Sequence, residues 1–383
     1  MRDRRTLLLL LLLVVCSPLL HAECPAFAAQ APLLSGAGNP IHLLPSDLNK
    51  DGLLDLVAFG QDSVAFQLGR GDGTFVAPGA VYPTGTGAWD KASGDLNLDG
   101  NEDFVVANLG DSSISVFLTR GDGTAITSVF PTITQPFAVA VADVTSDGNP
   151  DVLVGSFNYG LVVHTGDGKG AFSFQTIRAV PNVNTALAFV PHDLNGDGKL
   201  DLVVSLYETA SLGTFFGKGD GTFTTGPSIS TTATGGTRSL LLADLDHDGR
   251  LDAVHGTASN FGVEVFHGNG DGSFRRGGSF GAGDVSWALI ASDLTNDGNL
   301  DLLVTTRYQT GVRMLIGTGG GQFAPLRFLQ PSLFAYGLAA GDFDGDGRND
   351  IIVSDHESST ITVLRNTSDC SAPASSKRRS IRH

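Results

Sequence analysis

Seven short segments of the chain repeat one pattern of acidic residues. Each segment begins with Asp, has Asp again at its fifth and ninth positions and has Gly at its sixth, as in DLNGDGKLDLV, which begins at Asp193. These three Asp positions account for 21 of the 40 acidic residues of the chain. Closely spaced carboxylates beside a glycine that permits a sharp turn are typical of loops that bind Ca²⁺, a hard cation that prefers oxygen ligands.

The third position of each segment adds another side-chain oxygen, from Asn in three segments, Asp in two and Thr in two. The seventh position varies in residue type, as expected if its backbone carbonyl is the ligand. We therefore predict up to seven Ca²⁺ sites, weaker in the two Thr segments. The predicted side-chain ligands are Asp47, Asn49, Asp51, Asp55, Asp95, Asn97, Asp99, Asp103, Asp143, Thr145, Asp147, Asp151, Asp193, Asn195, Asp197, Asp201, Asp244, Asp246, Asp248, Asp252, Asp293, Thr295, Asp297, Asp301, Asp342, Asp344, Asp346 and Asp350.

Two other interpretations of these segments are open to test. An EF-hand begins with the same pattern but needs Glu at position 12 and a helix afterwards, whereas position 12 is here Ala, Val or His inside an apolar run. The simpler alternative is that the Asp side chains only cap turns. Three carboxylates within nine residues repel one another without a cation, and their repetition in all seven segments favours the metal.

Residues 1–22 predict a cleaved secretory signal. Arg2, Arg4 and Arg5 precede an apolar run over residues 7–15, and small or polar residues follow up to Ala22, an order typical of export signals. An uncleaved anchor is the alternative, but the run is short for a membrane span of about 20 residues. We expect a mature protein that is secreted, periplasmic or at the cell surface, monomeric, and without a transmembrane segment.

The charge of the mature chain excludes one class of partner. Loss of residues 1–22 removes three Arg and one Asp, which changes the formal net charge from −16 to −18. So acidic a chain repels the phosphate backbone of nucleic acids, and we expect no nucleic-acid partner. Seven bound Ca²⁺ would reduce the charge to about −4, which agrees with the metal prediction.

The spacing of the acidic segments predicts the fold. Consecutive copies begin 48 to 51 residues apart. Each copy lies between two apolar stretches, and a third apolar stretch and a glycine turn such as GRGDGTF, ending at Phe75, complete the unit. Four short strands per unit, repeated at this period, are typical of a β-propeller blade, whereas a parallel β-helix has shorter repeats. We predict an all-β, seven-bladed β-propeller of four-stranded antiparallel blades.

The two ends of the repeat region predict how the ring closes. Phe27 precedes Asp47 by the same 20 residues that separate Phe75 from Asp95, whereas the last unit ends after its third strand, at residues 361–364. The N-terminal strand should therefore complete the seventh blade. Cys24 and Cys370 would then meet, and export permits a disulfide between them, with two free thiols as the alternative. The propeller spans residues 23–370, and residues 371–383 form a basic tail that we expect to be disordered.

These motifs resemble the FG-GAP/VCBS repeat family, which includes the propeller of integrin α subunits. The resemblance covers residues 24–370, with departures at Thr145, Thr295 and Ala125. It implies that the calcium loops join the first and second strands of each blade on one face. It also implies that ligands meet the opposite face.

One set of large side chains is expected on that opposite face. The residues six positions before the first loop Asp should begin the innermost strands and surround the mouth of the central channel. Aromatic side chains there, with amide side chains in nearby loops, suit the binding of a sugar or a peptide, although packing between blades would also explain them. The predicted ligand-binding residues are Trp89, Phe137, Arg238, Trp287 and Tyr336.

Catalytic residues are not predicted. The histidines fall at unrelated positions of their repeats, most Asp are assigned to calcium, and no Ser/His/Asp arrangement can be placed in one site. We therefore expect a non-catalytic recognition, adhesion or scaffold module for an extracellular glycan or protein ligand. The alternative is an extracellular carbohydrate-active enzyme that resembles the propeller-shaped polysaccharide lyases.

Overall fold

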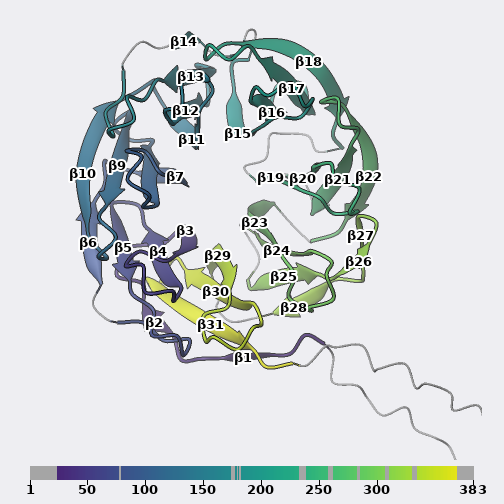
Figure 1. Ribbon diagram of the computed structural model, residues 1–383. Helices are drawn as coiled ribbons and strands as arrows, with labels where there is room; N and C mark the ends of the chain where they lie inside the picture. The colour runs from purple at the N-terminus through teal and green to yellow at the C-terminus, as the bar shows by residue number, and fades with distance from the viewer. Residues whose placement is uncertain are drawn as a thin grey trace, which may run out of the picture.

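The computed structural model describes residues 24–76, 79–173, 177–178, 180, 183–232, 239–257, 262–282, 285–306, 310–329 and 334–368. In this part of the chain the regular secondary structure consists of strands, without a helix. Seven small antiparallel sheets stand around a central axis (Figure 1). The predicted seven-bladed β-propeller is thus confirmed. None of the described segments forms a helix of the length and apolarity that a membrane crossing needs.

The first three blades follow one another in the chain, and each runs outwards from its innermost strand. The first contains β3 (His42–Ser46), β4 (Asp55–Phe59), β5 (Ser63–Gln67) and β6 (Ala80–Pro83). The second contains β7 (Ala88–Gly94), β8 (Asp103–Asn108), β9 (Ser113–Thr119) and β10 (Ala125–Pro131). The third contains β11 (Pro136–Ala142), β12 (Asp151–Ser156), β13 (Leu161–His164) and β14 (Ile177–Arg178).

The next three blades repeat this order. The fourth contains β15 (Ala186–His192), β16 (Asp201–Leu206), β17 (Ser211–Gly217) and β18 (Phe223–Ser230). The fifth contains β19 (Leu240–Ala243), β20 (Asp252–Gly256), β21 (Val263–Gly268) and β22 (Phe274–Phe280). The sixth contains β23 (Ser286–Ser292), β24 (Asp301–Thr306), β25 (Val312–Leu315) and β28 (Arg327–Leu329), with β26 (Gly317–Gly319) and β27 (Gln322–Phe323) as a separate small hairpin.

The seventh blade joins the two ends of the chain. It contains β29 (Ala335–Gly341), β30 (Asp350–Asp355) and β31 (Thr360–Asn366), and its outer strand is β1 (Phe27–Ala29). Residue Phe27 pairs with Asn366, and β2 (Leu33–Leu34) pairs with the other end of β31. The predicted closure by the N-terminal strand is therefore confirmed, and it leaves no open outer edge on β31.

The hydrophobic core lies between the blades. The second and third strands carry apolar side chains on both faces because a neighbouring blade covers each face, and every residue of β8 is buried. Between the first two blades, the ring of Phe104 lies 5.9 Å from Phe59 and 5.7 Å from Phe66, in edge-to-face contacts. The outer strand β10 is mostly exposed. Each blade therefore depends on its neighbours for burial.

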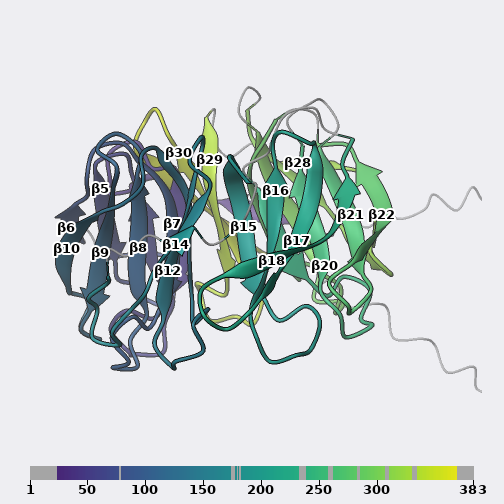
Figure 2. The ribbon, with the colours of Figure 1, turned by 90° about the horizontal axis from the view of Figure 1, so that it is seen from above.

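Viewed from the side, the strands cross the thickness of the ring and their connections gather at its two faces (Figure 2). Each predicted calcium loop connects an innermost strand to the second strand of the same blade, for example from β7 to β8. Because every innermost strand runs the same way through the ring, the seven loops share one face. The residues that begin the innermost strands lie towards the other face.

Candidate functional site

The first and sixth positions of each acidic loop build its turn. In the first loop, Oδ1 of Asp47 accepts a hydrogen bond from the backbone N–H of Asp51 (3.1 Å), and Oδ2 accepts one from Gly52 (2.9 Å). The glycine at the sixth position has a φ of +82° there, a conformation that costs other residues free energy. Equivalent pairs of bonds recur in the other six loops.

The Asp at the ninth position has a role that the sequence analysis missed. It is the first residue of the second strand in all seven blades, and it is fully buried. In the second blade, Oδ2 of Asp103 accepts from the N–H of Leu96 (3.0 Å), and Oδ1 accepts from the N–H of Thr119 at the end of the third strand (2.7 Å). Burial raises the pKa of this carboxyl to about 6. The side chain therefore fastens the loop to two strands.

The loops also connect neighbouring blades. Backbone carbonyls at the second loop position accept hydrogen bonds from the glycine turn of the next blade, as Leu48 does from Gly123 (3.1 Å) and Val144 does from Gly221 (3.0 Å). Across the ring closure, Gly73 donates to Phe343 (2.9 Å). A change in the shape of one loop must therefore affect the contact between two blades.

The donor atoms of the loops fit calcium. In the fifth loop, carboxylate oxygens of Asp244, Asp246 and Asp248 lie within 4.8 Å of one another, as do those of the equivalent residues in the seventh loop. All of these donors are oxygen, as Ca²⁺ prefers. The third loop has a hydroxyl in place of a carboxylate at its third position, and this hydroxyl, of Thr145, donates a hydrogen bond to Asp151 Oδ2 (3.1 Å). When bound, the ion would neutralise the carboxylates at positions one, five and nine, and also at position three in the two loops that have Asp there; this remains a prediction.

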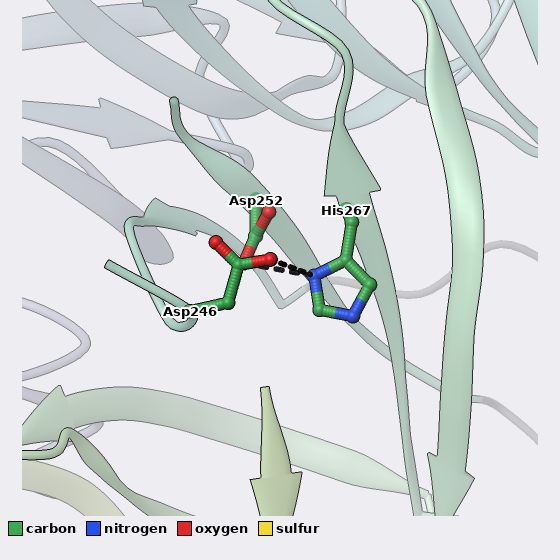
Figure 3. Close-up of side chains that lie close together, drawn as sticks. All are labelled: Asp246, Asp252 and His267. Carbon is green, nitrogen blue, oxygen red and sulfur yellow. Dashed lines mark hydrogen bonds and ion pairs between the residues drawn. The ribbon is translucent and has the colours of Figure 1, made fainter. Parts of the chain in front are cut away.

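The two loops with Asp at the third position share a basic neighbour. At the end of the third strand, His267 Nδ1 lies 3.3 Å from Asp246 Oδ2 and 3.1 Å from Asp252 Oδ2 (Figure 3). At the equivalent place in the seventh blade, Arg365 binds Asp344 through Nε (2.6 Å) and Nη2. In the other five blades this residue is apolar or Thr: Leu68, Leu118, Thr165, Phe216 and Ile316.

Aromatic side chains meet at the mouth of the central channel, as predicted. The ring of Trp89 lies 5.1 Å from Phe137 in the next blade and 5.8 Å from Trp287, which belongs to the sixth blade. The Trp pair therefore spans the channel instead of packing between neighbours. Trp287 in turn lies 4.8 Å from Tyr336. The remaining predicted ligand-binding residue, Arg238, lies outside the described residues.

Further aromatic residues extend this cluster over the surface. Phe157 lies 6.2 Å from Phe137 and 5.9 Å from Tyr207, and at the other end His356 stacks on Tyr336 at 4.6 Å. The side chains of Phe157 and Tyr207 are 38% and 43% exposed. We call these seven residues, Tyr207, Phe157, Phe137, Trp89, Trp287, Tyr336 and His356, the aromatic mouth.

A cavity of about 270 Å³ lies in the channel beside the Trp pair. Its lining includes His42, Asp90, Lys91 and Trp287. The imidazole of His42 is hydrogen-bonded to the carbonyl oxygen of Trp89 (2.9 Å) and lies 4.0 Å from Asp90. Burial lowers the pKa of His42, although the carboxylate of Asp90 acts in the opposite direction.

Comparison with known families identifies the repeat. Segments 47–106, 95–154, 143–204, 203–255 and 293–353 match the FG-GAP-like repeat, and together they span well over half of the chain. The chain belongs to the FG-GAP-like repeat family. The resemblance drawn from the sequence is thus confirmed. A comparison with curated proteins gave no match.

Solved structures show the same fold in proteins of low sequence identity to this FG-GAP repeat propeller. An Agrocybe aegerita lectin with specific recognition of non-reducing terminal N-acetylglucosamine has 19% identity and a TM-score of 0.56, over 83% of this chain and 86% of the lectin. BBS1N, solved in complex with ARL6DN, has 13% identity and a TM-score of 0.62, over 90% and 99%. The V. cholerae biofilm matrix protein Bap1 has 11% identity and a TM-score of 0.52, over 90% and 91%.

Two features of this FG-GAP repeat propeller were not anticipated. The contact between Trp89 and Trp287 joins blades that are distant in the chain, and an alignment of the repeats cannot predict it. His267 was grouped with histidines at unrelated positions. An alignment of the third-strand ends, together with the residue type at loop position three, would have separated it from the others.

Proposed function

We propose that the protein is a secreted, calcium-stabilised recognition module that binds a glycan at the aromatic mouth and has no catalytic activity. The observation that carries this proposal is the cluster of aromatic rings around one end of the channel. Rings with an apolar body and a polar edge contact the C–H faces of sugars, and nearby polar groups bind hydroxyls. Among proteins of this fold, a lectin recognises a sugar and BBS1N binds a protein.

Polar groups beside the mouth support a sugar ligand. Next to Phe157, the amide of Asn158 donates to the side-chain oxygen of Gln135 (3.0 Å), and both side chains are exposed. On the opposite rim, Asn39 donates to the carbonyl oxygen of His356 (3.1 Å). Amides offer both donors and acceptors, which suits neutral hydroxyl groups.

Calcium would act at a distance from this ligand. The acidic loops follow the ends of the innermost strands, whereas Trp89 and Trp287 lie at the beginnings of theirs. We therefore assign the ions a structural role: they hold the acidic loops, several of which also contact a neighbouring blade.

Export would add a covalent link at the ring closure. The N–H of Thr367 donates to the carbonyl oxygen of Ala26 (2.9 Å), which brings the segment after Cys24 beside the end of β31. Residue Cys370 lies outside the described residues, three positions beyond Thr367. We keep the Cys24–Cys370 disulfide and the cleaved signal as parts of the proposal.

The deciding experiment is a glycan array with the mature protein, followed by calorimetric titration of the best ligand. We expect Trp287→Ala and Tyr207→Ala each to weaken binding about 10- to 100-fold, as loss of a buried aromatic contact does. Phe328→Ala is the matched control, because this ring is 50% exposed on the outer strand of the sixth blade. If all three variants bound the glycan with the affinity of the wild type, the site would be refuted. If the protein bound no glycan but did bind another protein, the proposed class of ligand would be wrong.

A catalytic alternative has one observation in its favour. Burial lowers the pKa of His42, so its imidazole is neutral at pH 7 and can accept a proton, and Asp90 and Lys91 line the same cavity. However, the carboxylate of Asp90 already accepts a hydrogen bond from the N–H of Val139 (3.0 Å). Polysaccharide turnover by the wild-type protein that is lost in His42→Ala would establish this alternative.

A further inference from the structure

The fifth blade combines two carboxylates and an imidazole in one buried cluster. The side chains of Asp252, His267 and Asp246 are 1%, 5% and 14% exposed. Nδ1 of His267 points at one oxygen of each carboxylate, and all three ligand atoms lie within 4.8 Å of one another (Figure 3). The three residues come from the loop, the start of β20 and the end of β21.

The cluster has the spacing and rigidity of a metal site. Two ligands of a tetrahedral ion with bonds of about 2.0–2.2 Å are about 3.3–3.6 Å apart, and the two Nδ1–oxygen distances are 3.1 and 3.3 Å. The imidazole is held on both sides by glycines. A Cβ atom at Gly277 would lie 2.8 Å from the ring, and one at Gly321 would overlap it.

The two oxygens of Asp246 face different partners. Oδ1 accepts a hydrogen bond from the backbone N–H of Asp248 (3.3 Å), within the predicted calcium loop. Oδ2 faces His267, outside that loop. A carboxylate in this position can bridge two neighbouring cations.

The seventh blade shows that a cation is placed at this position elsewhere in the ring. Asp344 has the same arrangement: its Oδ1 accepts from Asp346 (3.2 Å), and its Oδ2 is bound by the guanidinium of Arg365. The carboxylates of Asp344 and Asp350 both raise the pKa of Arg365. In the seventh blade a fixed side-chain cation thus occupies the place that His267 occupies in the fifth.

We propose that Asp246, Asp252 and His267 form a second metal site, for a divalent first-row transition ion such as Zn²⁺. A nitrogen ligand favours such an ion over Ca²⁺, which takes oxygen ligands. Water would complete the coordination. Arg275, whose side chain is 55% exposed and lies 3.5 Å from Asp246 Oδ2, must turn towards solvent when the ion binds. The proposal does not depend on the glycan site. Asp246 and Asp252 are also predicted calcium ligands, so zinc binding is tested with calcium present.

The test is a calorimetric titration of the mature protein with Zn²⁺. The protein is first stripped of metal and then kept in about 10 mM CaCl₂, well above the 10⁻⁴–10⁻³ M range of extracellular calcium modules. We expect one Zn²⁺ per chain. His267→Leu, which installs the residue found at this place in the first two blades, should weaken zinc binding more than about 100-fold, because loss of an outer partner alone costs 10–100-fold. It should leave the calcium dependence of melting unchanged.

His247→Ala is the matched control, because His247 is exposed in the same loop. It should bind Zn²⁺ like the wild type. Loss of binding in this variant, or full binding in His267→Leu, would overturn the proposal. If His267→Leu fails to fold, zinc-edge X-ray absorption of the wild-type complex decides: an imidazole ligand supports the site, and an all-oxygen shell overturns it. Glycan binding and calcium-dependent melting, measured on the same samples, test the proposed function separately.

Discussion

Replacing Asp103 by Ala would remove the acceptor of two buried backbone N–H groups, those of Leu96 and Thr119. Each buried donor left without a partner costs about 1–3 kcal/mol, so we expect a loss of about 2–6 kcal/mol in the free energy of unfolding. Asp103→Asn keeps one acceptor oxygen but turns an amide donor towards the other N–H. Its cost should be of similar size, because that backbone N–H and the amide N–H that faces it both lack an acceptor.

The comparison with Asp99→Ala separates fastening from metal binding. Asp99 is the fifth residue of the same loop, and its Oδ1 accepts from the N–H of Asn101 (2.8 Å). At about 1 mM Ca²⁺ and a dissociation constant of 10⁻⁴–10⁻³ M, one site contributes about 0.4–1.4 kcal/mol. Asp99→Ala should lose that amount in calcium and little in chelator, whereas Asp103→Ala should lose its full cost in both.

Urea unfolding in calcium and in excess chelator measures all four proteins. Where a variant and the wild type have the same dependence of the free energy of unfolding on urea concentration, a shift in the urea midpoint reports a change in stability. If Asp103→Ala lies within about 0.5 kcal/mol of the wild type in chelator, the two hydrogen bonds do not fasten the loop, and the reasoning is wrong.

Excess chelator should lower the melting temperature of the wild type, because Ca²⁺ that binds only the folded state stabilises it; an unchanged curve would remove the metal sites. Mass spectrometry of the exported, unreduced protein should find Cys24 linked to Cys370, and two alkylatable thiols would contradict this. Deleting residues 24–35 should destabilise the protein, in urea unfolding, more than Cys24→Ser or deletion of residues 371–383 does, because β31 loses its outer partners. Burial lowers the pKa of His255 to about 4, so between pH 6.5 and about 4 the unfolded chain takes up a proton there and the folded protein does not. Lowering the pH over this range should therefore reduce the free energy of unfolding by about 3 kcal/mol. The variant His255→Gln should lose that part of the pH dependence of unfolding.

The fold and its closure could be predicted from the sequence because they follow from the residue types of each loop and from the number of residues between equivalent positions. The turn at each acidic loop needs a glycine with positive φ, and that glycine is visible in every repeat. The 20-residue offset of Phe27 then identified a displaced strand, and the pairing of Phe27 with Asn366 confirms it. Both predictions needed only the comparison of the repeats with one another along the sequence.

Contacts across the channel could not be predicted in the same way. Whether Trp89 reaches Trp287 depends on the diameter of the ring and on the rotamers of both side chains, and neither follows from the repeat. The double hydrogen bonding of Asp103 was hidden for another reason: a buried acceptor and a metal ligand call for the same residue type. The calcium ligands accordingly remain a prediction, while the fastening role rests on bonds of 3.0 and 2.7 Å.

The two faces of the ring impose different conditions on a partner. One face carries seven loops with at least three carboxylates each, so without calcium its field repels any polyanion. The other presents the aromatic mouth, where Trp89 and Trp287 meet over the channel. A neutral sugar meets no electrostatic barrier there, whereas an acidic polysaccharide approaching an acidic protein does. Among glycans, the charge distribution therefore favours neutral chains, and binding that is insensitive to salt would agree with this, since screening affects only charged partners.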